Sequence, residues 1–334
     1  MAALALDIGT YTIKAVAGKP GSAVEVIRTA EVFNTLGFSV PADEAQIDQL
    51  SQLVNNVITD HKFPISDVRL SLPESVVSTK VISIPPLSDA ELASAIGWQA
   101  EQHIPIPPEE LSLEYEVLYR PARGNKEEQM RVLLVGARRH IVDNYVKSFI
   151  NLGIEPTILE TQLLSVVRSL QFEVTDPPTL LVHIGANTMS IGMIHKGELV
   201  FIFNHMSGGQ MLSKALQQSI GLDANQAEQY KRTYGLDETQ FQGKVRQALE
   251  PGTRALTTEV VKAMRFFANQ AGSEAVQRVL LSGGTAQLPG FVQYMTEQVG
   301  VEVLVVAPFA NATGAIPESN HTALSVCMGL LMRE

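Results

Sequence analysis

The chain has 334 residues, more than one hydrophobic core usually organises, so we expect two lobes or domains. Hydrophobic residues make up 45% of it and charged residues 18%, which is typical of a packed fold and excludes a disordered chain. The formal net charge of -10 excludes the broad basic face that nucleic acid binding requires.

The chain starts in an apolar, strand-like segment at residues 2–6, without the charged leader of a secreted protein. Its single cysteine, Cys327, cannot form an internal disulfide, and no apolar run reaches the roughly 18 residues that span a bilayer. We therefore expect a cytoplasmic protein without direct membrane insertion.

The first strand-like segment begins a pattern that returns in the second half of the chain. Residues 6–27 can be placed beneath residues 182–203 with one constant offset and no gaps, which indicates an internal duplication. The aligned pairs are Asp7 and His183, Gly9 and Gly185, Thr12 and Thr188, and Gly21 and Gly197.

Each copy reads as three strands joined by tight turns. The first turn presents main-chain N–H groups and a threonine hydroxyl, which are donors for phosphate oxygens, and Gly9 or Gly185 lets a ligand approach the backbone. One copy alone is typical of an ordinary hairpin. Two copies in register favour a phosphate site.

Residues 74–151 have the pattern of a compact inserted α/β subdomain. We expect a helix opened by a capping box of Ser88 and Glu91. The other expected elements are strands at residues 76–84, 113–119 and 131–137 and a helix at residues 141–152.

A helix opened by Asp223 follows the second copy and carries Glu228 and Lys231 on one face. There a carboxylate can accept ribose hydroxyls and an ammonium can lie beside a base. A solvated ion pair on the helix surface would explain the same spacing.

A further glycine element follows an apolar strand that runs into Gly283 and Gly284. A helix at residues 291–299 and a strand at residues 301–306 come next, so a nucleotide can lie on the backbone at this strand-to-helix crossing. A structural glycine turn in the left-handed αL conformation is the alternative.

Together these elements resemble the actin and sugar-kinase superfamily, which implies an α/β, actin-like (ribonuclease H-like) fold of two lobes. The inserted subdomain resembles that of FtsA and of the PilM family of type IV pilus assembly proteins, and residues 99–107 and 115–118 are especially similar to the PilM family. FtsA continues into an amphipathic membrane helix that this chain does not supply after Glu334, so PilM is the closer match.

The resemblance implies ATP or ADP between the lobes, with Mg²⁺ held through water by Asp7. Gln162 stands where actin carries a water-orienting glutamine. The residues implied to contact the nucleotide are Asp7, Gly9, Thr10, Tyr11, Thr12, Lys14, Gly185, Ala186, Asn187, Thr188, Gly208, Gly209, Glu228, Lys231, Arg232, Gly283, Gly284 and Thr285.

One position departs from the superfamily pattern, because His183 replaces the second loop aspartate. A neutral imidazole is a poor partner for a hard cation, so we expect nucleotide binding with weak or absent hydrolysis. A structural histidine bonded within the strand end is the alternative explanation of His183.

The resemblance also implies a division of the chain. The expected parts are a first-lobe core (1–74, first phosphate loop), the inserted subdomain (75–152), a connecting helix (153–175), a second-lobe core (176–212, second phosphate loop), a helical subdomain at the adenosine (213–274), the rest of the second-lobe core (275–319, adenosine motif) and a C-terminal connecting helix (320–334).

The PilM resemblance implies a nucleotide-binding adaptor, peripheral to the inner face of the plasma membrane, that captures the cytoplasmic N-terminal peptide of a PilN-like inner-membrane protein. The expected groove lies between the inserted subdomain and the first lobe, with walls from residues 76–84 and the helix near Trp98, although a helical tryptophan is more typical of a core. Further partners left open are the pilus assembly ATPase, the platform protein and a second copy of the chain. The alternatives are an FtsA-like filament-forming ATPase and a small-molecule kinase of the same superfamily.

Overall fold

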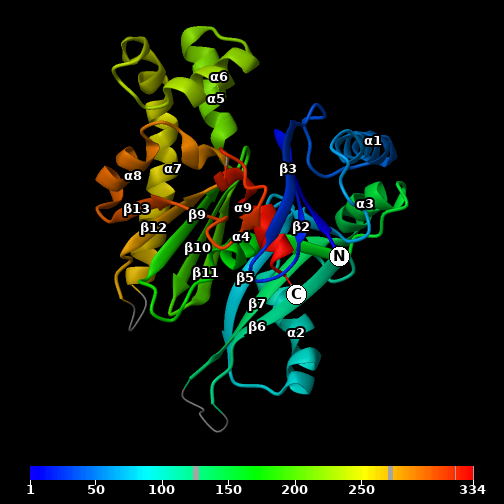
Figure 1. Cartoon of the computed structure of the whole chain (residues 1–334). Coiled ribbons are helices and arrows are strands. Elements are labelled where there is room, and N and C mark those ends of the chain that lie inside the picture. The colour runs from blue at the N-terminus through cyan, green and yellow to red at the C-terminus, as the bar shows by residue number, and fades with distance from the viewer. Residues whose placement is uncertain (123–127, 270–273, 320, 334) are drawn as a thin grey trace.

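A computed structural model describes residues 1–122, 128–269, 274–319 and 321–333, which form two lobes with an inserted subdomain below them (Figure 1). The first lobe is a mixed sheet in the order β14-β3-β2-β1-β4-β8, flanked by helix α1. Its elements are β1 (Ala3–Ile8), β2 (Thr12–Lys19), β3 (Glu25–Phe33), α1 (Glu44–Asp60), β4 (Val68–Leu72), β8 (Ile158–Thr161) and β14 (Thr313–Gly314).

The second lobe is built on a sheet in the order β11-β10-β9-β12-β13, with α5, α6 and α7 rising above it. Its elements are β9 (Thr179–Ile184), β10 (Met189–His195), β11 (Glu198–His205), α5 (Gly209–Ile220), α6 (Ala224–Tyr234), η1 (Phe241–Gly243), α7 (Lys244–Ala268), β12 (Arg278–Ser282), η2 (Gly284–Gln287), α8 (Phe291–Val299) and β13 (Glu302–Val305).

The predicted duplication is confirmed by the strand pairing. β1 pairs antiparallel with β2 and parallel with β4, while β9 pairs antiparallel with β10 and parallel with β12. Both first turns close with the same backbone hydrogen bond, from Gly9 N to Thr12 O at 3.0 Å and from Gly185 N to Thr188 O at 2.9 Å. Each lobe therefore presents one copy of the hairpin turn at the same end of its sheet.

The inserted subdomain has the elements that the sequence predicted, with boundaries moved by one or two residues. They are β5 (Val77–Ile84), α2 (Asp89–His103), β6 (Leu111–Tyr119), β7 (Met130–Arg138) and α3 (Arg139–Ile150). α3 lies beside α1 and packs into the first-lobe core through Tyr145 and Phe149 (Figure 1). The capping box of Ser88 and Glu91 is present, and Leu92, Ile96 and Ala100 form the buried face of α2. Trp98 points away from this face and is 61% exposed, so the expectation of a core tryptophan is wrong.

Two connecting elements lie between the lobes, α4 (Gln162–Leu170) and α9 (Ser325–Leu331), the latter preceded by η3 (His321–Leu324) (Figure 1). They pack closely at Gly329, where a Cβ atom would lie 1.7 Å from the Ser165 carbonyl oxygen. In the described part of the chain, the C-terminal helix begins at Ser325 and not at the predicted residue 320. Asn320 and Glu334 lie outside the described residues.

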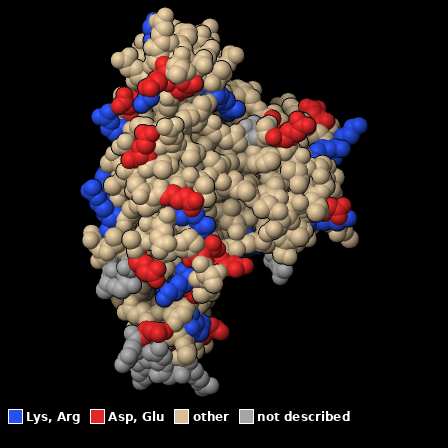
Figure 2. Space-filling view, turned by 60° about the vertical axis from the view of Figure 1, so that its left-hand side comes forward, with Lys and Arg blue, Asp and Glu red and all other residues tan. Residues whose placement is uncertain are grey.

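One face of the surface carries both signs of charge. On the face in Figure 2, acidic and basic side chains are interspersed, without a broad basic area among the residues drawn in colour. Among the described helices, none is both long and apolar enough to cross a membrane.

Candidate functional site

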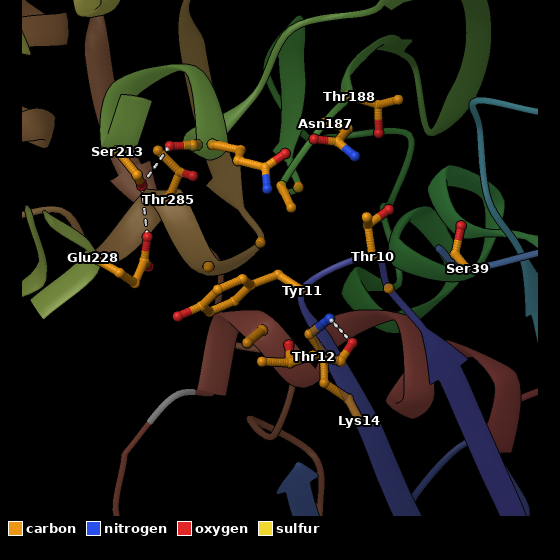
Figure 3. A pocket seen from close by; sticks show the side chains of 18 of the residues that line it. Thr10, Tyr11, Thr12, Lys14, Ser39, Asn187, Thr188, Ser213, Glu228 and Thr285 are labelled. Carbon is orange, nitrogen blue, oxygen red and sulfur yellow. Dashed lines mark hydrogen bonds between the residues drawn. The ribbon is translucent and has the colours of Figure 1, made fainter. Parts of the chain in front are cut away.

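A cavity of about 340 Å³ lies between the two lobes, where both hairpin turns, α6 and the strand-to-helix crossing after β12 meet (Figure 3). The structure brings every predicted nucleotide residue except Gly208 into its lining, together with Gln162 and His183. Residues from six separate segments of the sequence therefore converge on one space, as the predicted site requires.

The two hairpin turns form facing walls of this cavity, with Thr10 on one side and Asn187 on the other (Figure 3). A Cβ atom at Gly9 would lie 2.8 Å from the Thr12 carbonyl oxygen, so the turn itself requires glycine. Gly208 stands behind the second turn, because its Cβ would lie 2.6 Å from the Gly185 carbonyl oxygen. Gly208 thus packs closely against the turn and is not among the residues that line the cavity, and its contact with a nucleotide stays a prediction.

Asp7 lies at the floor of the cavity and is 2% exposed. Its Oδ1 accepts hydrogen bonds from Ser71 Oγ at 2.7 Å and Gln162 Nε2 at 2.6 Å, and its Oδ2 accepts one from Lys14 Nζ at 3.2 Å. Burial alone would raise the pKa of Asp7, but the Lys14 charge and the two hydrogen bonds hold this pKa below its ordinary value. Asp7 is therefore a charged carboxylate at neutral pH.

His183 lies at the equivalent position of the second copy and is buried. Its Nδ1 is 3.1 Å from Ser282 Oγ on the neighbouring strand. Burial lowers the pKa of His183 to about 4, with Lys14 adding to the fall and Asp7 opposing it. The imidazole is thus neutral at pH 7, bonded at the strand end as the structural alternative requires.

Gln162 begins α4 and connects Asp7 to Glu74, in the segment between β4 and β5. Its Nε2 donates to Asp7, and its Oε1 accepts from the backbone N–H of Glu74 at 3.5 Å. The amide group is therefore oriented by protein partners. Its role in positioning water stays a prediction.

The predicted adenosine side of the cavity is organised by Glu228. One carboxylate oxygen accepts from Ser213 Oγ and Lys231 Nζ, both at 2.6 Å, and the other from Arg232 Nε at 2.9 Å. The side chains of Glu228 and Lys231 are 12% and 9% exposed, so the alternative of a solvated surface pair is wrong. Burial lowers the pKa of Lys231, and Glu228 opposes that fall.

Arg232 also reaches across the cavity to the first lobe. Its guanidinium carbon lies 5.8 Å from the centre of the Tyr11 ring, on the turn after β1. This cation–π contact joins the helical subdomain to the first phosphate loop.

The two glycines after β12 differ in what surrounds them. Gly283 has φ +86° and ψ 175°, which is outside the αL region, and its Cβ would lie 2.4 Å from the Ile184 carbonyl oxygen. Gly284 has open space where a Cβ atom would stand. Gly283 thus serves backbone packing, whereas Gly284 leaves room on the cavity side.

Sequence reasoning missed other lining residues. They are Glu31, Ser39, Pro73, Ser75, Gln210, Ser213, Gln217, Ala224, Gln287, Leu288 and Ala323. Ser213 lies one helical turn beyond Gly209 on α5, a spacing that would have placed both on one face. Glu31 stands opposite Lys14 in the pairing of β2 with β3, which only the strand register reveals.

The comparisons with known proteins agree with this geometry. Residues 5–334 match the model of the family described as type IV pilus assembly protein PilM. The chain belongs to the PilM family.

Solved structures show the same fold. The PilM-PilN type IV pilus biogenesis complex contains a chain with a TM-score of 0.86 and 24% identity, over 98% of this chain and 97% of that one. The ethanolamine utilization protein EutJ from Carboxydothermus hydrogenoformans has a TM-score of 0.57 and 19% identity, over 99% and 89%. MreB5 of Spiroplasma citri bound to AMPPNP has a TM-score of 0.55 and 12% identity, over 98% and 94%. The predicted actin-like fold is confirmed.

The residues present fit the expected Mg²⁺ poorly. Asp7 already meets the Lys14 ammonium and two further donors, and His183 is neutral. Among the described residues, no three His, Cys, Asp or Glu side chains gather as metal ligands. Coordination of Mg²⁺ through Asp7 stays a prediction from the resemblance.

Proposed function

We propose that this PilM-family chain is a nucleotide-binding adaptor of a type IV pilus assembly platform. In this proposal it binds ATP or ADP between its lobes and holds the cytoplasmic N-terminal peptide of a PilN-like inner-membrane protein. The observation that carries the proposal is the family match across residues 5–334. That match favours the adaptor over the filament-forming ATPase and the small-molecule kinase.

The cavity supports the nucleotide part of the proposal. Its two turns present N–H groups and hydroxyls to the place proposed for the phosphates, and Lys14 supplies a positive charge there. Glu228 and Arg232 lie on the side proposed for the ribose and base, and Gly284 leaves space for the ligand. The nucleotide would thus lie between the two hairpin turns and α6.

The inserted subdomain supports the peptide part. Its sheet has the order β5-β7-β6, so β6 is an edge strand, and Glu114, Tyr115 and Glu116 on it are exposed. An extended peptide gains backbone hydrogen bonds at such an edge and side-chain pockets beside it. Trp98 on α2 offers a large exposed surface of the kind that anchors protein interfaces.

The proposal places the protein at the inner face of the plasma membrane through its partner. The pilus assembly ATPase, the platform protein and a second copy of the chain are further partners that the same adaptor would bring together. Its work is assembly, so rapid ATP turnover is not required of it.

The test is isothermal titration of the whole protein with a synthetic N-terminal cytoplasmic peptide from the PilN-like protein of the same source, with and without ATP. A peptide of the same composition in scrambled order is the control. We expect a dissociation constant of about 10 μM or tighter for the native order only. Equal binding of both peptides, or binding of neither at several hundred micromolar, would contradict the adaptor.

A further inference from the structure

The floor of the nucleotide cavity carries an unusual balance of charge. Asp7 is negative, Lys14 is positive and His183 is neutral, so this group sums to zero. With two loop carboxylates and the same lysine it would carry one negative charge. The protein therefore lacks the negative floor that attracts a divalent cation to the phosphates.

Lys14 occupies the remaining space beside the one carboxylate. Its Nζ lies 3.2 Å from Asp7 Oδ2 and 3.5 Å from the Thr12 carbonyl oxygen, and its side chain is 14% exposed. Burial opposes the charge of Lys14, but Asp7 and Glu31 outweigh it and raise this pKa, so the ammonium is present at neutral pH. A hydrated cation at Oδ2 would lie next to this ammonium and be repelled by it.

The other charges around the cavity do not restore an attraction for metal. Its remaining charged lining residues are Glu31 and Glu228, and Lys231 and Arg232, so acidic and basic groups balance again. Glu228 is bonded to both cations of α6. At the floor, the second copy contributes His183, which is bonded to Ser282 and carries no negative charge.

The consequence follows from the reciprocity of binding. A metal ion raises the affinity of the protein for the nucleotide by the same factor by which the protein raises the affinity of the nucleotide for the metal ion. A neutral floor with an ammonium beside its one carboxylate raises the affinity of the nucleotide for a metal ion very little. The cation that meets the phosphates is then Lys14, assisted by the N–H groups of the two turns.

We propose that this site binds its nucleotide without depending on a divalent metal ion. Lys14 is then the counter-charge of the phosphates, and His183 is the residue whose neutrality leaves a metal ion without a second protein carboxylate. This rests on the proposed nucleotide function. His183 then has a defined function, because an aspartate at this position would make nucleotide binding depend on a metal ion.

The test is the affinity of the whole protein for ADP and ATP in EDTA and in millimolar Mg²⁺. For the unaltered protein we expect the two dissociation constants to agree within about threefold. His183→Asp should bind at least about tenfold more tightly in Mg²⁺ than in EDTA. His183→Asn, which keeps a polar group for Ser282 without a charge, is the matched control and should behave like the unaltered protein.

Loss of at least about tenfold in affinity when EDTA replaces Mg²⁺ would overturn this proposal and leave the nucleotide function standing. Binding in neither solution would overturn the nucleotide function and this inference with it.

A second measurement serves if His183→Asp does not fold. Electron paramagnetic resonance of Mn²⁺ reports how much of the ion is free. A mixture of protein, Mn²⁺ and ADP should contain as much free ion as a mixture of Mn²⁺ and ADP without the protein. Additional Mn²⁺ bound in the ternary mixture would overturn the proposal.

Discussion

Asp7 and His183 occupy the same position in the two copies of one hairpin, and each is bonded to a serine of the neighbouring parallel strand. The Asp7 carboxylate accepts from Ser71 Oγ at 2.7 Å, and His183 Nδ1 lies 3.1 Å from Ser282 Oγ. The duplication therefore extends to the partners of the two side chains. One copy keeps a charge and the other is neutral, and we expect this difference to weaken the hold of the cavity on a metal ion.

The first prediction concerns ATP turnover. We expect the protein to hydrolyse ATP more slowly than about once per second, because phosphoryl transfer depends on positioned cations that the neutral floor does not hold. His183→Asp should raise the rate in Mg²⁺ by about tenfold, and His183→Asn should not. Phosphate release measured at saturating ATP checks this, and several turnovers per second in the unaltered protein would contradict it.

The second prediction concerns pH and stability. The pKa of His183 is about 4 in the folded protein and about 6.5 when unfolded, so its contribution is complete above pH 6.5 and is lost as the pH falls toward 4. Between pH 7 and pH 5 the protein should lose about 2 kcal/mol more unfolding free energy than His183→Asn. Urea unfolding at both pH values measures the difference. Parallel losses in the two proteins would show that His183 is not the titrating group.

The third prediction concerns Glu74, a buried carboxylate at the junction of the lobes. It accepts from Leu163 N at 3.0 Å and from Asn204 Nδ2 at 2.9 Å, and burial raises its pKa despite these bonds. Glu74→Ala leaves both donors unpaired and should cost about 1 to 3 kcal/mol of unfolding free energy at pH 7.

Glu74→Gln is the matched control for this position. It removes the buried charge, keeps an acceptor and offers a donor to Asn204 Oδ1, which lacks a partner among the described residues. A raised folded pKa means that the charged form opposes folding as the pH rises, so the glutamine variant should be at least as stable at pH 7. Equal losses in the two variants would contradict the proposed balance between charge and hydrogen bonds.

The fourth prediction concerns Trp98. Because this side chain is 61% exposed, Trp98→Ala should change the unfolding free energy by less than about 0.5 kcal/mol. The affinity for the PilN-like peptide should fall by about tenfold or more, because the exposed indole is the proposed anchor of the peptide. Val174→Ala, at an apolar residue that is 73% exposed outside the inserted subdomain, is the control. Peptide binding that is unchanged in Trp98→Ala would exclude α2 from the groove.

Much of the fold could be predicted because local signals and the global fold agree. The constant offset between the two hairpins, the capping box at Ser88 and the helix at residues 291–299 all have the predicted positions. Each depends on backbone patterns that a sequence displays directly.

The features that could not be predicted depend on packing between segments that are distant in the sequence. Gly208 is a glycine because the backbone of the second turn lies against it, and Trp98 faces solvent because Leu92 and Ile96 already fill the core of its subdomain. Glu228 and Lys231 are enclosed by Ser213 and Gly209 of another helix. Spacing along one helix cannot reveal such neighbours.

Gly284 gives the most direct test of the central claim, which is that the cavity binds a nucleotide. A Cβ atom added there meets no atom within 4 Å and requires no unusual backbone, so we expect Gly284→Val to fold normally while filling space at the cavity lining. Gly97 on α2 is equally free of neighbours, and Gly97→Val is the matched control away from the cavity.

The measurement is the dissociation constant of ADP for the three proteins, with thermal unfolding as the check of folding. We expect micromolar binding by the unaltered protein and Gly97→Val, and at least about tenfold weaker binding by Gly284→Val at an unchanged unfolding temperature. Absence of ADP binding by the unaltered protein, or equal affinity in Gly284→Val, would contradict the account.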